Sequence, residues 1–475
     1  MPTSDIPDDE PGELASMHRT PLPKIQLFIV LCIQLAEPIT ALVIFPFVLQ
    51  FVRDTGITGG DEARYVGLIE SVFFLGEAVT VFQVGRLSDI YGRRPFLLVG
   101  LLGLALSMMG FGLSNTVWAL LGFRCAQGAF NGTTGAATTV IMEISDASNL
   151  ATMMSMSGTV WSVGSSMGSF IGGTLANPAA KWPDNTTSLT LDFLRAHPYF
   201  LPCGVAAGFA LASFFFALVG LRETSPSAVA RLQQKQRSPA TETDPLLGGQ
   251  NLCSESFDAN TVPTVRELIT RPVCLVLGNY GLFTFLDMAN TSLQTLVYAT
   301  PIGMGGLGLE SFDIGLILGL TITINCFIQF FFGGAIIRYF GPRAIFTATF
   351  CLEATTPLAC ALTTFFAKRA GRIDGAVIAV LVCQLSPSFL IASAHASTYV
   401  LTMDAAPNPA SRGGVNGLLR LVGTTLRCAA PLFASTLFAL SNTNNLAGGY
   451  MVYIIQGVLA LAAIWCSMLL LRNLP

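Results

Sequence analysis

The segment GRLSDIYGRR at residues 85–94 returns in altered form as GAIIRYFGPR at residues 334–343. Both segments have glycine at the first and eighth positions and arginine at the tenth, and they start 249 residues apart. Each lies between two long apolar runs, at the corresponding place in its half of the chain. Because glycine allows the tight turns that join neighbouring helices, the pattern predicts a duplicated helical unit.

The composition around these segments is that of a membrane protein. Hydrophobic residues make up 52% of the 475 residues and charged residues 11%, against about 25% charged residues in soluble domains. The mean hydropathy is +0.62. We therefore expect a chain that crosses the lipid bilayer repeatedly.

On either side of these two turns, the chain has twelve apolar runs in all that are long enough to cross a bilayer. Backbone groups that face lipid must be hydrogen-bonded within their own segment, so each run is predicted to be helical. The predicted fold class is an all-α membrane protein with twelve transmembrane helices in two pseudo-symmetric six-helix bundles. The runs lie near residues 25–51, 64–84, 95–114, 117–141, 150–177, 198–221, 272–300, 311–337, 343–366, 374–403, 413–440 and 447–471.

A polar stretch between the sixth and seventh runs divides the chain. It has too few large apolar residues to form a core and is predicted to be a linker. The acidic head has the opposite charge to that of a cleaved signal peptide, so we expect the first run to be retained. The predicted divisions are a disordered cytoplasmic head at 1–24, a first bundle at 25–222, a cytoplasmic linker at 223–271, a second bundle at 272–471 and a cytoplasmic tail at 472–475.

The distribution of basic residues predicts the orientation. Lysine and arginine are more numerous on the side of the termini, which is therefore expected to be cytoplasmic. Asn185, in the sequon Asn-Thr-Thr, would then lie outside the cell or in a lumen, where it could be glycosylated. A linker segment from Glu242 to Leu247 resembles an acidic dileucine sorting signal for a vacuole. The plasma membrane and the vacuolar membrane are both compatible with the sequence.

Several classes of function are excluded at this stage. A net charge of −3 gives no basic field to attract nucleic acid. The cysteines form no CxxC pair and the three histidines are scattered, so neither a metal nor another cofactor is predicted. No nucleophile and base have a spacing typical of an enzyme. We expect a monomeric, non-enzymatic membrane protein.

The charges inside the apolar runs indicate proton chemistry. Five carboxylates lie there against two arginines, so at most two acids can be paired one-to-one. A carboxylate removed from water favours its protonated form, which a proton-coupling site requires. Glu37 and Glu77 are the candidate proton carriers, whereas Glu70, Glu353 and His395 are open to a structural or a functional interpretation. The five acids are Glu37, Glu70, Glu77, Asp287 and Glu353, and the two arginines are Arg124 and Arg427.

The two arginines need partners. Arg124 lies about seven residues inside its run, where an unpaired charge costs about 2.5–3.5 kcal/mol on insertion scales. We expect Arg124 to be the charge partner of Glu37 and Glu77. Asp287 and Arg427 also fall near the middle of their runs and could form the ion pair of the second bundle.

Three motifs resemble the major facilitator superfamily of secondary transporters. GRLSDIYGRRP at 85–95 is similar to the superfamily's signature between its second and third helices. Arg124, Gln127 and the following glycine resemble its Arg-x-x-Gln-Gly motif. GSSMGSFIGG at 164–173 resembles the glycine-rich motif of its antiporters, with Ser169 in place of the usual proline. Small residues at this spacing could instead serve only close helix packing.

The resemblance implies which residues control conformation. Asp89 is expected to cap a helix or pair across the bundle at the inner face, and Arg93 and Arg94 are expected to stay among the lipid headgroups. Ile90 departs from the superfamily pattern, which usually has arginine there. The implied gating residues are Gly85, Asp89, Gly92, Arg93, Arg94, Gly164, Gly168, Gly172 and Gly173.

The opening of the first run narrows the resemblance further. AEPITALVIFPFVLQF at 36–51 is similar to the opening of plant and fungal proton-coupled drug or metal-chelator exporters. This implies secondary active, proton-coupled efflux of small organic molecules or metal chelates by alternating access. A non-transporting receptor or sensor on the same scaffold is the alternative. The residues expected at the proton and substrate site are Glu37, Glu77, Arg124, Gln127, Asp287 and Arg427.

Overall fold

The computed structural model describes residues 23–58, 60–145, 150–181, 189–225, 228–229, 269–386, 388–405 and 412–473. These residues form helices and turns and contain no strand. The helices of the first half are α1 (Lys24–Leu42), α2 (Val48–Asp54), α3 (Glu62–Tyr91), α4 (Arg93–Leu113), α5 (Val117–Asn131), α6 (Thr134–Glu143), α7 (Leu150–Leu175), α8 (Pro178–Lys181), α9 (Leu189–Ala196) and α10 (Phe200–Gly220).

The second half has fewer but longer helices. They are α13 (Arg271–Ala299), α14 (Ser311–Ile328), α15 (Gly334–Phe340), α16 (Pro342–Ala370), α17 (Gly375–Leu385), α18 (Ser388–Ala405), α19 (Arg412–Thr443) and α20 (Met451–Asn473). A π-helical turn, Gln329–Gly333, joins α14 to α15.

The all-α membrane fold class is confirmed. Ten of the predicted runs correspond to helices that are long and apolar enough to cross a membrane. The fourth run is divided into α5 and α6 at residues 132–133, and the fifth run is α7. The count of twelve crossings therefore stays a prediction for these two runs.

The first run differs from the expectation of one continuous helix. It is divided into α1 and α2 by a turn at residues 43–47. Pro46 lies in this turn, where it lacks a backbone N–H and restricts Phe45 to non-helical conformations. Pro38, in contrast, is accommodated inside α1.

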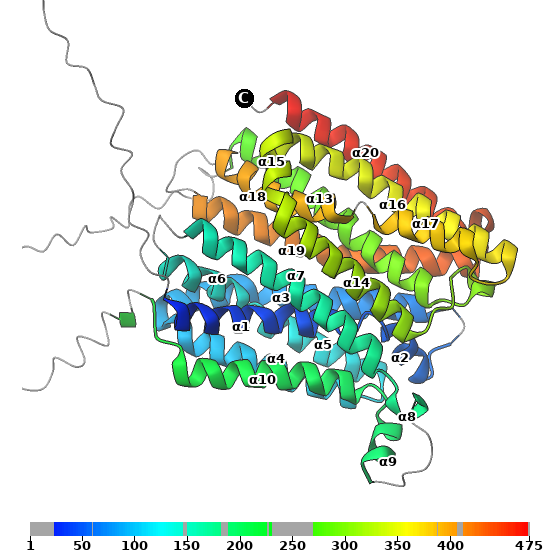
Figure 1. The fold of residues 1–475 in the computed structure, drawn as a ribbon, viewed down its shortest axis with the longest axis horizontal. Helices are drawn as coiled ribbons and strands as arrows, with labels where there is room; N and C mark the ends of the chain where they lie inside the picture. The colour runs from blue at the N-terminus through cyan, green and yellow to red at the C-terminus, as the bar shows by residue number, and fades with distance from the viewer. Residues whose placement is uncertain are drawn as a thin grey trace, which may run out of the picture.

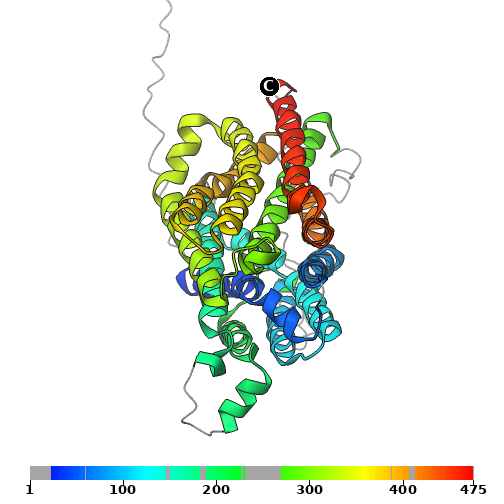
Figure 2. The ribbon, with the colours of Figure 1, turned by 90° about the vertical axis from the view of Figure 1, so that its right-hand side faces the viewer.

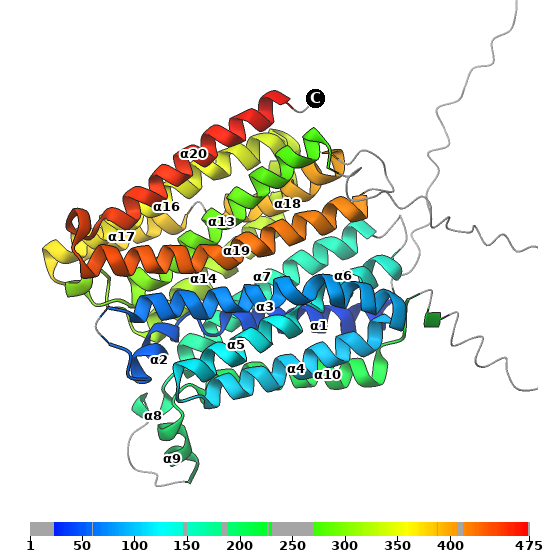
Figure 3. The ribbon, with the colours of Figure 1, turned by 180° about the vertical axis from the view of Figure 1, so that it is seen from behind.

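The helices of each half are grouped together (Figure 1). Seen along the helices, the second half lies above the first (Figure 2). The halves meet where α3 packs along α19 and α7 packs along α14. From behind, α3 and α19 are close at the end that carries α2 and diverge toward the end that carries the chain termini (Figure 3). We call these the α2 end and the terminal end.

Close contacts between the halves lie toward the α2 end. A Cβ atom added to Gly173 of α7 would lie 2.7 Å from the Cα atom of Gly315 of α14. On the other side of the molecule, a Cβ atom on Gly67 of α3 would lie 2.6 Å from the carbonyl oxygen of Pro431 of α19. Glycine therefore permits backbone-to-backbone contact between the halves at both places.

The glycine-rich stretch of α7 also packs within the first half. Added Cβ atoms at Gly164, Gly168 and Gly172 would lie 2.5 Å from Pro38 Cγ, 2.7 Å from the Ile39 carbonyl oxygen and 2.0 Å from the Val43 carbonyl oxygen. These three glycines hold α7 against α1, which supports the packing interpretation of this stretch. Of the four predicted gating glycines on α7, Gly173 is the one that packs against the other half.

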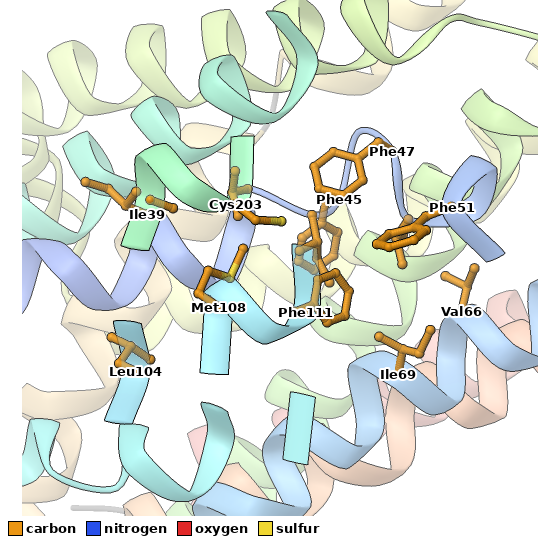
Figure 4. Packing of buried hydrophobic residues seen from close by; sticks show 14 of the residues in the cluster. Ile39, Phe45, Phe47, Phe51, Val66, Ile69, Leu104, Met108, Phe111 and Cys203 are labelled. Carbon is orange, nitrogen blue, oxygen red and sulfur yellow. The ribbon is translucent and has the colours of Figure 1, made fainter. Parts of the chain in front are cut away.

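An aromatic cluster fixes the α2 end of the first half (Figure 4). The Phe51 ring centroid on α2 lies 5.6 Å from that of Phe111 on α4 and 4.3 Å from that of Tyr199, which precedes α10. Phe47 stacks on Tyr199 at 5.2 Å. These rings are buried, so α2 is anchored to α4 and α10 by apolar contact.

Some predictions fall on residues that the structure does not describe. These are the glycosylation site Asn185, the dileucine-like segment from Glu242 to Leu247, most of the head and most of the linker. They stay predictions.

The packing of α7 on α1 predicts the effect of one added methyl group. Gly172→Ala should destabilise the protein by about 1–3 kcal/mol, the range for overpacked cores, because the new Cβ would meet the Val43 carbonyl oxygen. Thermal unfolding in detergent measures the effect. Gly158→Ala on the same helix is the matched control, because its Cβ would meet nothing within 4 Å. Equal melting temperatures for the two variants would contradict this account of the interface.

Candidate functional site

The first half brings Glu37 and Glu77 together through a third residue. Asn131, the last residue of α5, donates a hydrogen bond from Nδ2 to Glu37 Oε1 on α1 at 2.8 Å. Asn131 also hydrogen-bonds the Glu77 carboxyl on α3. Asn131 is buried and the two carboxyl groups are half-buried. Three helices therefore meet at two acids bridged by one amide.

Asn131 is not among the site residues predicted from the sequence. A signal was nevertheless present, because Asn131 follows Arg124 by seven residues. Two turns of helix separate them, so they share one face of α5. The residue that bridges the acids therefore lies on the same face as the predicted Arg-x-x-Gln-Gly motif.

Arg124 is not placed against Glu37 or Glu77, which corrects the expected pairing. It is 2% exposed and donates from Nη1 to Gln127 Oε1 and from Nη2 to the Ala41 carbonyl oxygen at 3.0 Å. Its guanidinium lies 4.4 Å from the centroid of the Phe73 ring. Within the described segments, no carboxylate lies within 4.0 Å of it.

Gln127 completes this arrangement. Its Nε2 donates to the Thr40 carbonyl oxygen at 3.0 Å. Arg124 and Gln127 thus bind two successive carbonyl groups of α1, just before the turn that leads to α2. The motif positions α5 on α1, and the arginine is stabilised by neutral dipoles and an aromatic face instead of a carboxylate.

Two arginines of the second half act on the acids of the first. The charges of Arg420 and Arg427, both on α19, interact electrostatically with Glu37 and Glu77. These interactions associate Arg427 with Glu37 and Glu77 of the first half, and not with Asp287 as expected. Arg420 is not among the site residues predicted from the sequence, although its spacing of seven residues from Arg427 places both on one helix face.

Asp287 pairs with a histidine. His395 Nε2 on α18 lies 3.6 Å from Asp287 Oδ2 on α13, and both side chains are about one-third exposed. The Phe283 ring meets the imidazole edge-on at a centroid distance of 4.8 Å. Asp287 and His395 thus connect the seventh and tenth predicted runs, as Glu37 and Asn131 connect the first and fourth. Each half therefore has an acid and a polar partner on corresponding helices, as the internal duplication would produce.

Glu353 lies deeper in the second half. It is 1% exposed and accepts a hydrogen bond at Oε2 from Asn290 Nδ2 at 2.6 Å. Asn290 also donates to the Glu353 backbone carbonyl at 3.1 Å. Since both residues belong to the second half, this contact links α13 to α16 within one bundle.

The loop between α3 and α4 forms a charge network at the terminal end. Arg93, expected among lipid headgroups, is instead 7% exposed and donates from Nε and Nη2 to Glu143 Oε1 at 3.1 Å. Asp89 pairs with Arg93, four residues further along the same segment. Arg94 donates to the Leu218 carbonyl oxygen at 2.6 Å. The network binds the loop to α6 and α10 of its own half.

Gly92 makes a close contact in this loop that Gly85 does not make. The carboxylate of Glu223 accepts the backbone N–H groups of Arg93 at 2.7 Å and Arg94 at 3.1 Å, which caps α4. Gly92 has φ = +111°, and a Cβ atom there would lie 2.5 Å from Glu223 Oε2. A Cβ atom on Gly85 would meet nothing within 4 Å. Sequence reasoning missed Glu223 because the contact spans more than a hundred residues.

Metal ligands are not gathered in the part of the chain that the structure describes. No group of three or more His, Cys, Asp or Glu side chains there could hold a metal ion. The charged side chains that the structure brings together in the two halves are carboxylates, arginines and a histidine.

Two helical bundles that meet along α3, α7, α14 and α19, with charged side chains near the middle of their helices, define a membrane transporter. The family model described as Major Facilitator Superfamily matches residues 29–431. The chain belongs to this superfamily.

Relatives and solved structures agree with this assignment. The chain is 30% identical to the major facilitator-type transporter psiT2 of Psilocybe cyanescens, over 98% of this chain and 93% of the relative. It is 25% identical to the efflux pump azaK of Aspergillus niger, over 92% of this chain and 86% of the relative. A bacterial homologue of the human lysosomal transporter Spinster, solved in an inward-facing and unoccupied conformation, has the same fold, with a TM-score of 0.67, 15% identity, and coverage of 95% and 97% of the two chains.

The contacts of Arg124 predict that its shape matters beyond its charge. Arg124→Lys should lower stability by about 1.5–3 kcal/mol, the range for hydrogen bonds to charged groups, because one ammonium cannot reproduce the planar contacts with Gln127, Ala41 and Phe73. Thermal unfolding in detergent measures this loss. Arg427→Lys is the comparison, since Arg427 acts on Glu37 and Glu77 through its charge. A larger loss in Arg427→Lys than in Arg124→Lys would contradict the assignment.

Proposed function

We propose that this protein is a proton-coupled exporter of small organic molecules or metal chelates that works by alternating access. The observation that carries the proposal is the arrangement around Asn131. Glu37 and Glu77 of the first half share this amide, while Arg420 and Arg427 of the second half act on both acids.

This arrangement makes protonation depend on the position of the two halves. Two neighbouring carboxyl groups away from bulk water resist simultaneous ionisation, and nearby arginines favour the ionised form. The acids lie on α1 and α3, and the arginines lie on α19. Movement of one half against the other changes the distance between the acids and the arginines. A proton is then bound when the arginines withdraw and released when they approach.

The same movement gives access to one side of the membrane at a time. The close contacts between the halves lie toward the α2 end, and α3 and α19 diverge toward the terminal end (Figure 3). With the termini in the cytoplasm, as the basic residues predict, this arrangement is closed outward and open inward. The related protein named an efflux pump supports export as the direction.

Asp287 and His395 are the corresponding pair of the second half in this proposal. They place an imidazole and a carboxyl group from two helices of the second half next to each other. A substrate that carries charge would compete for the same groups. The alternative of a non-transporting receptor has less support, because the relatives carry the names of a transporter and a pump.

Neutralisation of Glu77 tests the proposal. In proteoliposomes, wild-type flux of a substrate found by screening organic cations, metal chelates and natural products should rise several-fold when a pH gradient is imposed. Glu77→Gln should be expressed and folded normally and lose this stimulation, because the glutamine side chain carries no exchangeable acid proton.

Glu310→Gln is the matched control, because Glu310 is exposed at the start of α14. It should keep the wild-type response to the gradient. Unchanged stimulation in Glu77→Gln would remove Glu77 from the coupling mechanism.

A further inference from the structure

A lone acid lies in the contact between the two halves. Glu70 of α3 is 1% exposed, and Ser292 of α13 donates a hydrogen bond to its Oε2 atom. Its other oxygen, Oε1, is buried without a hydrogen-bond partner. Among the described residues, no lysine, arginine or histidine lies within 4.0 Å of this carboxyl group.

The elements packed around Glu70 offer almost no charge. From α5, Arg124 acts on it electrostatically, but the guanidinium is hydrogen-bonded to Gln127 and to the Ala41 carbonyl. From α13, the facing group is the Ser292 hydroxyl. α19 carries Arg427, whose charge acts on Glu77, two turns further along α3. The contacts of α19 next to Glu70, at Gly67 and Ser71, are made by neutral hydroxyl and backbone groups.

These contacts with α19 are tight. A Cβ atom on Gly67 would lie 1.8 Å from Ser435 Oγ. The Ser71 hydroxyl accepts the backbone N–H of Leu432 at 3.1 Å. Glu70 therefore lies between two contacts that join α3 to the second half, in an interface that is closely packed beside Gly67.

We propose that Glu70 is a proton-dependent latch between the two halves, protonated while α3 packs against α13 and α19 and ionised when the halves part at the α2 end. Burial in this contact removes the water that would solvate an ionised carboxylate and leaves it one neutral hydrogen-bond donor. The ionised form is therefore disfavoured. Separation of the halves admits water and reverses the preference. Glu70 is then a third proton-binding residue, distinct from Glu37 and Glu77.

This inference rests on the proposed function and adds a direction to it. With cytoplasmic termini, the α2 end faces outward. Protons from the outer side would then bind Glu70 in the open arrangement and permit the halves to close there. Closure would become easier as the outer medium becomes more acidic.

Hydrogen–deuterium exchange of the purified full-length protein in detergent tests the latch without a substrate. The measured quantity is deuterium uptake in peptides that cover residues 60–71 and 431–443, corrected for the intrinsic pH dependence of exchange. In the wild type, uptake should increase from acidic to alkaline pH as the α2 end opens. Glu70→Gln should lose this increase, because glutamine imitates the neutral acid at every pH.

Glu353→Gln is the matched control. Glu353 is also a 1% exposed glutamate with an amide donor, but its partner Asn290 belongs to the same half. It should retain the wild-type increase in uptake. Ser292→Ala should raise uptake at acidic pH, since the latch then lacks its hydrogen bond to the second half.

Two results would overturn the latch. The first is a Glu70→Gln variant whose deuterium uptake still increases with pH as in the wild type. The second is a Glu353→Gln variant that loses this increase. Either result would leave the proposed function intact if Glu77→Gln still lost coupling in vesicles. Conversely, pH-dependent opening lost only in Glu70→Gln would support the latch even if flux proved independent of protons.

Discussion

Carboxyl groups held away from water without a permanent counter-ion are the constraint on which this transporter depends. Glu37 and Glu77 share the amide of Asn131. Glu70 has only the hydroxyl of Ser292. Neutral donors of this kind stabilise a carboxyl group without fixing its charge, so the protonation state can follow the surroundings. A full ion pair at each acid would hold the charge and the two halves in one arrangement.

The buried Arg124 is likewise stabilised by neutral groups and not by a carboxylate. Arg124 binds the side chain of Gln127, a carbonyl oxygen of α1 and the face of Phe73. These contacts hold the positive charge of Arg124 within the first half. Among the described segments, no carboxylate lies within 4.0 Å of it. Arg420 and Arg427 are the charges that would move relative to Glu37 and Glu77 when the halves move, because α19 belongs to the second half. Glycine contacts such as Gly173 with Gly315 let the halves approach each other closely enough for these interactions.

Much of the fold was predictable from the sequence, because membrane crossing forces long apolar helices and the turn at 85–94 has a repeat at 334–343. The break at Pro46 was not predicted, since hydropathy does not distinguish one helix from two in an apolar run. The site residues Glu37, Glu77 and Arg124 were predictable because a charged side chain inside an apolar helix is energetically unfavourable in lipid and therefore indicates a functional role. Their partners were not, because pairs such as Asp287 with His395 and Arg93 with Glu143 depend on how distant helices pack.

The central claim is that acids of this transporter that lack a permanent counter-ion bind and release protons as their surroundings change. Infrared difference spectroscopy of the purified protein during a pH titration measures this directly through the carbonyl stretch of protonated carboxyl groups. We expect such a band at neutral pH, with a loss of intensity as the pH rises and a smaller amplitude in a Glu37→Gln variant. A spectrum without protonated carboxyl groups at neutral pH, or with a band that Glu37→Gln leaves unchanged, would contradict it.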